Sequence, residues 1–303
     1  RKKIMGSYQI ISDGSCDLGR ERSDRIGVKI IPYYVSFDGE KFYKEIEEMD
    51  VRRFYTHMAE HPKVFPKTSL PPVQDYVDAF TSAARQGRDI LCLCLSGKFS
   101  GSFNSARNAA QIVRELFQNV RIAVVDTTLA TALQGLLVQE CARMRDAGLD
   151  LDSVLEKVEK IKTTGRIFFS VGSMDYLIHG GRVGKVIGLA ASTLGIKPLI
   201  SMKNGEIYPE GMTRSRKKAF VRIMDMARNF FKESGENADH YAFASGYGYD
   251  YKECVEFTDH LVASMQSYCH INAMEIYQIG ATIGVHTGPY PLGMGFLKRY
   301  EYV

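Results

Sequence analysis

The chain has 303 residues and a formal net charge of +4, and 45% of its residues are apolar. This length favours two domains, and the small charge, without a basic stripe interleaved with aromatic residues, excludes the usual nucleic-acid-binding proteins. The six cysteines form no CxxC pair and no apolar run reaches the ~20 residues that span a bilayer, so we expect a soluble cytoplasmic protein with reduced thiols and no zinc ribbon.

Strand and helix patterns alternate through the first half of the chain. We expect strands at residues 8–12, 28–37, 90–95 and 120–125, and helices at 51–61, 73–86, 102–118, 129–146 and 150–163. Asp50 is placed to cap the first of these helices, and residues 66–72 are expected to form a loop. Strands separated by helices of this length predict βαβ units and a mostly parallel sheet.

A second series of elements begins near residue 164. We expect strands at 166–171, 196–202, 207–209, 241–246, 273–279 and within 292–301, and helices at 214–233 and 250–267. The dipeptide Asn204-Gly205 lies between two of these strands and is a strong hairpin signal. The sequence therefore predicts an α/β protein with two α/β domains, residues 1–163 with a mostly parallel sheet and residues 164–303 with a mixed sheet.

Residues 91–106, LCLCLSGKFSGSFNSA, combine a buried strand, a small polar loop and the start of a helix. The polar side chains crowded there are Ser96, Ser100, Ser102, Asn104 and Ser105. Their hydroxyl groups, and the free N–H groups of the first helical turn, can bind a phosphate or a carboxylate. In open α/β sheets such loops gather at the carboxyl ends of the strands, where ligands bind.

Three other polar positions are candidates for the same site. If Ser69 caps the helix at 73–86, the hydroxyl of Thr68 is free to bind a ligand, and a local bond to the backbone is an equal alternative. His286 lies in a glycine-rich segment and can act as a neutral donor, a cation or a general base. Arg182 follows a short helix and can clamp an anion, although a surface arginine is the more common role.

Two further groups of residues, one of histidines and one of aspartates, are weaker candidates for a metal or acid–base site. His57 and His61 match the HxxEH pattern of some zinc peptidases, but no third ligand can be identified. Asp13 and Asp17 suit acid–base or metal roles, although a helix cap and a turn are the more common roles. We therefore predict no metal site.

Taken together in order and spacing, these loops resemble the DegV family, bacterial fatty-acid-binding proteins whose FakB members present acyl chains to a kinase. The resemblance covers nearly the whole chain. The segments that carry it are 10–18 (IISDGSCDL, similar to the family's DSTSDL-like loop), 31–32 (IP), 67–71 (KTSLP), 96–106 (SGKFSGSFNSA), 181–182 (GR), 213–219 (TRSRKKA) and 286–289 (HTGP). Each segment is weakly specific alone, and together they are specific.

The resemblance implies one long-chain fatty acid between the two domains, with its tail in an apolar tunnel. By the motif match, the residues that bind the carboxylate are Thr68, Ser69, Ser100, Gly101, His286 and Thr287. Arg182 is implied as a nearby counter-charge. The resemblance also implies no cofactor and no chemistry by this chain itself, because a separate fatty acid kinase phosphorylates the bound acid to an acyl phosphate for phospholipid synthesis.

The chain departs from the family pattern at three positions. Cys16 replaces the usual Ser or Thr, Pro72 stands where a small polar residue is frequent, and Tyr290 follows the HTGP motif where Gly or Ala is common. We expect Tyr290 to alter the pocket and Pro72 to alter the start of the helix. The Gly- and Ala-rich segment 188–195 suits either a tunnel wall or close helix packing.

Two functional alternatives stay open at this point. The basic segment 214–218 suits docking of the kinase or transient docking to an anionic membrane surface, although a solvated helix face is the more common role. Ser100 and His286 could instead be the nucleophile and base of a lipid or ester hydrolase, with Asp13 or Asp126 as the orienting acid. The spacing around Ser100 is not the GxSxG of a hydrolase elbow, which argues against this alternative.

Overall fold

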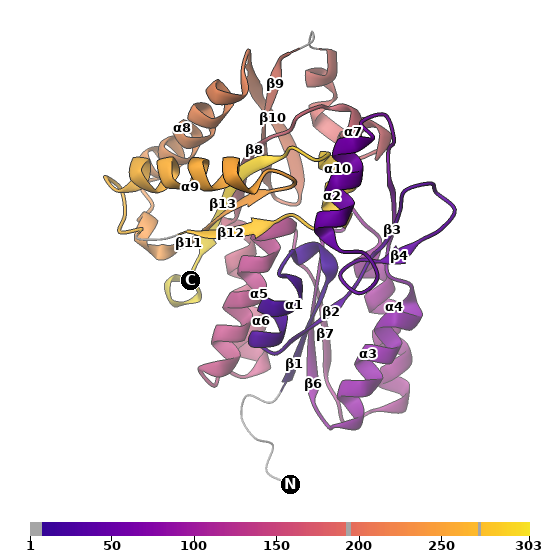
Figure 1. Ribbon diagram of the computed structural model, residues 1–303. Helices are drawn as coiled ribbons and strands as arrows, with labels where there is room; N and C mark the ends of the chain where they lie inside the picture. Colours follow the sequence, from indigo (N-terminus) through magenta and orange to yellow (C-terminus); the bar gives the residue numbers. More distant parts are fainter. Residues whose placement is uncertain (1–7, 192–194, 272–273) are drawn as a thin grey trace.

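The first half of the chain forms a four-stranded parallel sheet, as its alternating pattern predicts. The computed structural model describes residues 8–191, 195–271 and 274–303, and in this sheet the strand order is β2-β1-β6-β7. The strands are β1 (Tyr8–Asp13), β2 (Val28–Ile31), β6 (Asp89–Cys94) and β7 (Ile122–Asp126). Helices α3 (Val73–Arg85) and α4 (Ser102–Leu116) cover one face, and α5 (Thr131–Asp146) packs on the other (Figure 1).

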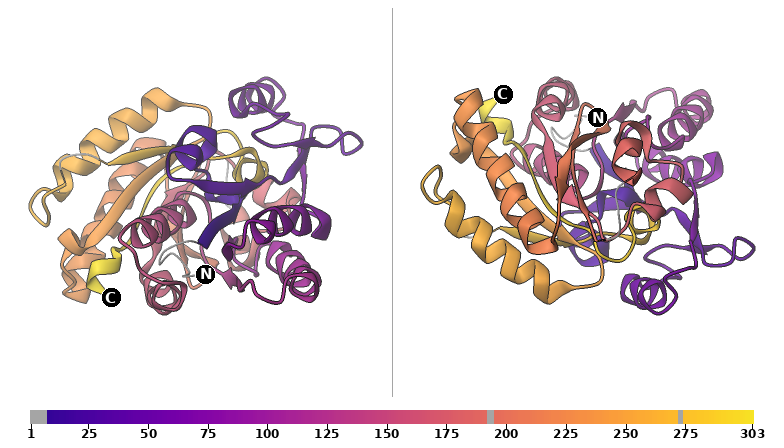
Figure 2. Two further views of the ribbon diagram at one scale, coloured as in Figure 1. Left: turned by 90° about the horizontal axis from the view of Figure 1, so that it is seen from below. Right: turned by 90° about the horizontal axis from the view of Figure 1, so that it is seen from above.

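The second half forms a mixed six-stranded sheet with the order β10-β9-β8-β13-β11-β12. Its strands are β8 (Arg166–Ser170), β9 (Lys197–Lys203), β10 (Glu206–Thr213), β11 (Tyr241–Tyr247), β12 (Glu275–Gln278) and β13 (Leu292–Lys298). All neighbours are antiparallel except the pair β11–β12. Helices α8 (Arg216–Ser234) and α9 (Tyr251–Met265) cover the outer face (Figure 2). The predicted α/β class, with one parallel and one mixed sheet, is confirmed.

A small third sheet, β4-β3-β5, was not predicted. It consists of β3 (Tyr34–Ser36), β4 (Tyr43–Lys44) and β5 (Lys67–Ser69). The single strand predicted at 28–37 is therefore wrong, because it breaks at Pro32. Proline has no N–H group to continue a ladder, and the N–H group of Tyr33 donates to Glu45 Oε1 instead.

Short helices complete the structure. They are η1 (Gly14–Cys16), α1 (Gly19–Arg25), α2 (Val51–Glu60), α6 (Leu151–Thr164), α7 (Asp175–His179), η2 (Gly184–Ala191), η3 (Ala238–His240), α10 (Ala281–Thr287) and η4 (Tyr300–Tyr302). The predicted cap of α2 is confirmed, because Asp50 Oδ1 accepts from the N–H group of Arg53 at 2.9 Å. The predicted hairpin is also confirmed, and Asn204 and Gly205 have the positive φ values, 52° and 80°, that its tight turn requires.

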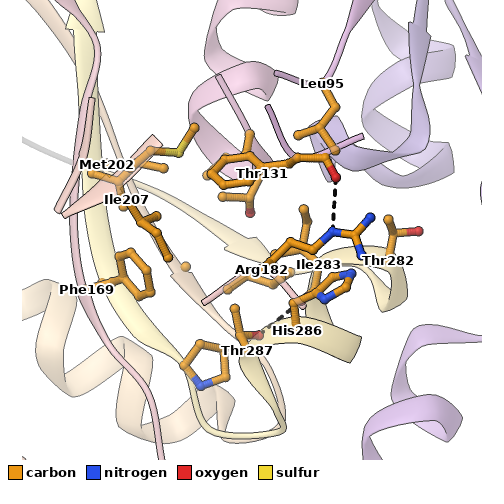
Figure 3. A pocket seen from close by; sticks show the side chains of 18 of the residues that line it. Leu95, Thr131, Phe169, Arg182, Met202, Ile207, Thr282, Ile283, His286 and Thr287 are labelled. Atoms are coloured by element: carbon orange, nitrogen blue, oxygen red, sulfur yellow. Dashed lines mark hydrogen bonds between the residues drawn. The ribbon is translucent and has the colours of Figure 1, made fainter. Parts of the chain in front are cut away.

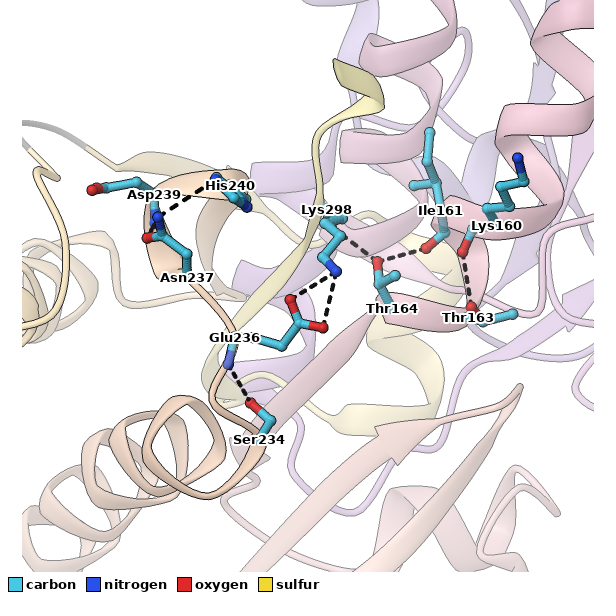
Figure 4. Close-up of polar contacts among 10 residues, drawn as sticks. All are labelled: Lys160, Ile161, Thr163, Thr164, Ser234, Glu236, Asn237, Asp239, His240 and Lys298. Atoms are coloured by element: carbon cyan, nitrogen blue, oxygen red, sulfur yellow. Dashed lines mark hydrogen bonds and ion pairs between the residues drawn. The ribbon is translucent and has the colours of Figure 1, made fainter. Parts of the chain in front are cut away.

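One hydrophobic core joins the two larger sheets. Helix α5 packs on β1 of the first sheet and on β11 and β13 of the second, and their buried apolar side chains form one cluster. A hydrogen bond also joins the two halves of the chain, because Thr164 Oγ1 at the end of α6 accepts from the N–H group of Lys298 on β13 (Figure 4). The boundary at residues 163/164 falls in the last turn of α6, just before β8, and stays a prediction. No helix in the described part of the chain is both long and apolar enough to cross a membrane.

Candidate functional site

A cavity of about 330 Å³ lies between the loop after β6 and the inner face of the six-stranded sheet. This volume is at the small end of the range for ligand-binding cavities. Apolar side chains such as Phe169, Met202 and Ile207 form one side, and polar side chains such as Arg182 and His286 lie opposite (Figure 3). The polar residues that line the cavity are Tyr33, Thr68, Ser69, Ser100, Thr131, Arg182, Thr282, His286 and Thr287.

The hydroxyl group of Ser100 is arranged as a hydrogen-bond donor. Ser100 Oγ accepts from the Tyr33 hydroxyl at 3.0 Å and from the N–H group of Ser102 at 3.1 Å. A hydroxyl oxygen has two acceptor lone pairs, and these two bonds occupy both. The proton of Ser100 is therefore left to donate, and Ser100 lines the cavity.

The buried carboxyl group of Asp13 holds the loop after β6, which carries Ser100, in place. Asp13 Oδ2 accepts from the N–H group of Leu95 and from the hydroxyl of Ser102, both at 2.8 Å. Its Oδ1 accepts from Ser15 Oγ at 2.5 Å and from Gln134 Nε2 at 2.9 Å. Burial raises the pKa of Asp13, and these hydrogen bonds oppose the rise. Asp13 thus ties the end of β1 to the loop after β6, the start of α4 and α5.

Thr68 and Ser69 reach the cavity from β5, which pairs with β3. Within the described residues, no hydrogen bond occupies the hydroxyl group of Thr68, so it is free for a ligand. The expected capping role of Ser69 is wrong, because Pro72 is the residue before α3 and no side chain caps that helix. Pro72 itself has extended backbone angles, so α3 begins only at Val73, too far along the chain for Ser69 to cap it.

His286 lies on the last turn of α10, where the sequence predicted a loop. Burial, followed by the positive charge of Arg182, lowers the pKa of His286 to about 4, so the imidazole is neutral at pH 7. Its Nδ1 atom is buried and has no hydrogen-bond partner among the described residues. A Cβ atom at Gly180 would lie 2.1 Å from this nitrogen, so the absence of a side chain at Gly180 gives the ring its room.

Arg182 lies at the edge of the cavity and is exposed to solvent. Its Nε donates to the carbonyl of Phe99 at 3.1 Å, and its Nη1 donates to the carbonyl of Gly180 at 2.8 Å. These bonds fix the guanidinium group between the loop after β6 and the end of α7. Arginine has five N–H donors, so further donors stay available for an anion near His286.

Thr131 and Thr282 are two cavity residues that the sequence did not suggest. Thr131 Oγ1 donates to Asp17 Oδ2 at 2.6 Å, and Thr282 Oγ1 donates to Glu45 Oε2 at 2.7 Å. Burial raises the pKa of both carboxyl groups. The protons of both threonine hydroxyls are thus used, and neither can donate to an anion. Among the described residues, the hydroxyl groups that line the cavity and donate no hydrogen bond are those of Thr68, Ser69 and Ser100.

The structure therefore brings together six of the seven residues that the sequence nominated: Thr68, Ser69, Ser100, Arg182, His286 and Thr287. Gly101 directly precedes α4 and is not a lining residue, although a Cβ there would meet Leu70 Cδ2 at 3.1 Å. The signal for Thr282 was its spacing of one helical turn from His286, which becomes visible only once 281–287 is known to be helical. Nothing in the sequence indicated Tyr33.

Other nominated features lie elsewhere. In the segment 188–195, residues 192–194 lie outside the described residues, and the others do not line the cavity. The His57 and His61 rings stack with centroids 4.3 Å apart. In the described part of the chain, no three His, Cys, Asp or Glu side chains are grouped to hold a metal ion.

Comparison with known proteins identifies the family of this chain. A family model described as "Uncharacterised protein, DegV family" matches residues 7–299. The chain belongs to the DegV family. A DegV domain-containing protein of Deinococcus radiodurans is 29% identical over 288 residues, which cover 95% of this chain and 97% of that protein.

Two solved structures are similar over almost their full length. A fatty acid (stearic acid)-binding protein from Eubacterium ventriosum is 39% identical with a TM-score of 0.93, covering 98% of this chain and 100% of that chain. A DegV family protein from Thermus thermophilus, described by its fatty acid binding, is 27% identical with a TM-score of 0.85, covering 96% of this chain and 99% of that chain.

Proposed function

We propose that this protein is a carrier that binds one long-chain fatty acid, with no chemistry of its own. The observation that carries the proposal is the pairing of free donors, at Ser100 and Thr68, with an otherwise mostly apolar cavity. In this proposal Thr68, Ser69, Ser100, Gly101, His286 and Thr287 bind the carboxylate, and Arg182 supplies a nearby positive charge. The tail lies against Phe169, Met202 and Ile207 and their neighbours.

Physical chemistry supports this division of the cavity. A buried carboxylate without partners is very unfavourable, so the head group needs several donors close together. Each buried methylene contributes about 0.8 kcal/mol of transfer free energy before ordering costs, so the apolar side supplies most of the affinity. The fatty acid binding of the E. ventriosum and T. thermophilus relatives gives further support.

Lipid analysis of the purified protein tests this proposal. We expect native mass spectrometry to detect one bound fatty acid, and both Thr68→Ala and Ser100→Ala to weaken its retention. Thr163→Ala is the matched control, because Thr163 is an exposed threonine that bonds only locally, to the carbonyl of Lys160. Absence of lipid after mild purification would refute the carrier assignment, whereas equal retention in all three variants would refute the roles of Thr68 and Ser100.

We further propose that a cytoplasmic fatty acid kinase phosphorylates the bound acid. Leu70 and Arg182 both line the cavity and are exposed, so they mark a mouth through which the head group can be reached. The kinase would transfer the γ-phosphoryl group of ATP to a carboxylate oxygen, releasing ADP. Incubating the loaded protein with a bacterial fatty acid kinase and ATP should give an acyl phosphate that hydroxylamine traps, and no trapped product would contradict this step.

The basic segment 214–218 is proposed to dock transiently on an anionic membrane. Arg214, Lys217 and Lys218 are exposed, whereas Arg216 pairs with Glu253 and donates to the carbonyl of Tyr290. Each exposed cation near an anionic surface contributes about 1 kcal/mol. The triple change of these exposed cations to Gln should reduce co-sedimentation with phosphatidylglycerol vesicles, and unchanged binding would favour a merely solvated helix face.

The hydrolase alternative gains no support from the geometry. A nucleophilic serine must give its proton to a base, but the hydroxyl of Ser100 accepts both of its hydrogen bonds in the described structure, and neither comes from His286. An esterase assay decides between the two functions, because turnover that disappears in Ser100→Ala would replace the carrier by an enzyme.

A further inference from the structure

The inner face of the six-stranded sheet forms the floor of the cavity, and its residues differ sharply in size between two halves. On β8, β9 and β10 the floor residues are large: Ile167, Phe169, Met202 and Ile207. On β11 and β13 the residues that face the cavity are small: Ala244, Gly246, Gly293 and Gly295. Leu292 and Met294 of β13 also border the cavity, but they alternate with these glycines and pack in the cluster formed with α8 and α9. Gly246 lies opposite Gly293 and Ala244 opposite Gly295, so the small residues form one continuous recess beside the large ones.

Neither the backbone nor the packing of the protein requires glycine at position 246. Its φ is outside the left-handed region, and glycine inside a strand is unfavourable because it packs no side chain. A Cβ atom there would meet only ordinary contacts, 3.6 and 3.7 Å from the side chain of Ile279. By contrast, a Cβ at Gly293 would lie 2.5 Å from the carbonyl oxygen of Phe168. The protein could accept a methyl group at Gly246, which would occupy space in the cavity.

We propose that Gly246 determines which acyl chains this protein prefers, by keeping open a lateral recess that accepts the bend of a cis double bond. The inference rests on the proposed fatty acid binding. A straight polymethylene chain gains its full dispersion energy only where walls contact it on every side. The large residues of β8 to β10 offer such walls, and the recess over β11 and β13 adds width that a straight chain leaves unfilled. A bent chain fills this width.

The test compares two acids of equal length, octadecanoate and cis-9-octadecenoate, by competition against a fluorescent fatty acid. Overfilling a packed site by one methyl group is unfavourable. We therefore expect Gly246→Ala to weaken binding of the bent acid about tenfold and binding of the straight acid by less than threefold. Ala244→Gly enlarges the same recess and should raise the preference for the bent acid.

Gly188→Ala is the matched control, because Gly188 lies outside the cavity and a Cβ there meets nothing within 4 Å. Circular dichroism and thermal unfolding establish that each variant is folded. If the variants bind both acids but Gly246→Ala leaves their ratio unchanged, the role of Gly246 is refuted while the carrier function stands. If the unsubstituted protein binds neither acid, the proposed function itself fails.

Discussion

At the scale of single residues, the orientation of one proton distinguishes a binding serine from a nucleophilic one. Tyr33 and the N–H group of Ser102 fill both lone pairs of Ser100 Oγ. In a hydrolase, the hydroxyl of the nucleophilic serine would instead donate its proton in a hydrogen bond to a base. The sequence could nominate Ser100 from the small polar loop after a buried strand. It could not show the direction of the proton, because Tyr33 comes from a distant turn.

This geometry makes Tyr33 a positioning residue for Ser100. In Tyr33→Phe the serine keeps its hydroxyl but loses one of the two bonds that orient it, and a neutral hydrogen bond contributes about 1 kcal/mol. We expect about fivefold weaker fatty acid binding, and a larger loss in Ser100→Ala. Titration with a fluorescent fatty acid measures both. The double variant should be no weaker than Ser100→Ala alone, and additive losses would contradict the shared role.

In the proposed carrier, His286 should make fatty acid binding depend on pH. Burial and the charge of Arg182 lower its pKa to about 4 in the free protein, against an ordinary value of 6.5. A bound carboxylate favours the charged imidazolium and raises this pKa, so binding takes up a proton. Affinity should therefore increase as the pH falls from about 8 to about 6, where fatty carboxylates are still ionised.

Calorimetry in two buffers of different ionisation enthalpy measures this proton uptake directly. His286→Gln keeps a neutral donor and should abolish both the proton uptake and the pH slope of the affinity. A slope that persists unchanged in His286→Gln would assign the titration to another group.

At the scale of secondary-structure elements, Glu45 couples α10 to the small sheet. Its Oε1 accepts from the N–H group of Tyr33 at 3.3 Å, and its Oε2 accepts from the N–H group and the hydroxyl of Thr282 at 3.2 and 2.7 Å. A single buried carboxylate thus fixes the helix that carries His286 against the segment that carries Tyr33.

Replacing this carboxylate should loosen both segments. Glu45→Gln keeps one acceptor oxygen and turns an amide group toward buried donors, and an unsatisfied buried donor costs about 1–3 kcal/mol. We expect the free energy of unfolding to fall by about 2 kcal/mol in urea denaturation, together with weaker fatty acid binding. Glu47→Gln, an exposed change in the same turn, should have almost no effect. Equal stabilities of the two variants would show that Glu45 does not couple these elements.

The elements that the sequence predicted correctly are those with strong local signals. Alternation and capping located the long helices, and Asn204-Gly205 located the hairpin. Among the elements that it missed, β5 and α10 are short and depend on partners far away in the chain. Thr68 adopts a strand because Val35 lies beside it, and Ala281–Thr287 is short and glycine-containing, which gives weak helical propensity. Both elements carry cavity residues, so the site was harder to predict than the fold.

At the scale of the whole molecule, the cavity exists because α5 is shared by both sheets. This helix packs on β1, β11 and β13, and its first residues, Thr131 and Ala132, line the cavity. The sequence predicts that α5 is helical and apolar, but it does not show that two different sheets pack against this helix. The same arrangement brings three carboxyl groups, those of Asp13, Asp17 and Glu45, into the buried layer between the sheets.

Burial of these carboxyl groups should make the stability of the ligand-free protein depend on pH. Burial raises the pKa of Asp17 well above its ordinary value, and the nearby charge of Glu45 adds to the rise. In the unfolded chain Asp17 loses its proton near pH 4, whereas in the folded protein it keeps the proton to higher pH. Its stabilising contribution is therefore complete below about pH 4 and is lost as the pH rises through the raised folded value.

The variant Asp17→Asn isolates this contribution, because the amide cannot titrate and its oxygen still accepts from Thr131. Urea denaturation from pH 4.5 to pH 8 should show the free energy of unfolding of the unsubstituted protein falling, relative to that of Asp17→Asn, as the pH rises. His286, whose pKa is lowered, acts in the opposite direction between about pH 4 and 6.5 in both proteins, so the difference removes it.

Asp38→Asn is the control with the opposite sign. Hydrogen bonds from the N–H groups of Lys41 and Glu40 lower the pKa of the exposed Asp38 to about 2, so its stabilising contribution is present above about pH 4 and is lost only in stronger acid. Asp38→Asn should therefore leave the slope between pH 4.5 and pH 8 unchanged. If Asp17→Asn leaves it unchanged as well, the proton on Asp17 is not linked to folding, and the buried layer tolerates the carboxylate without loss of stability.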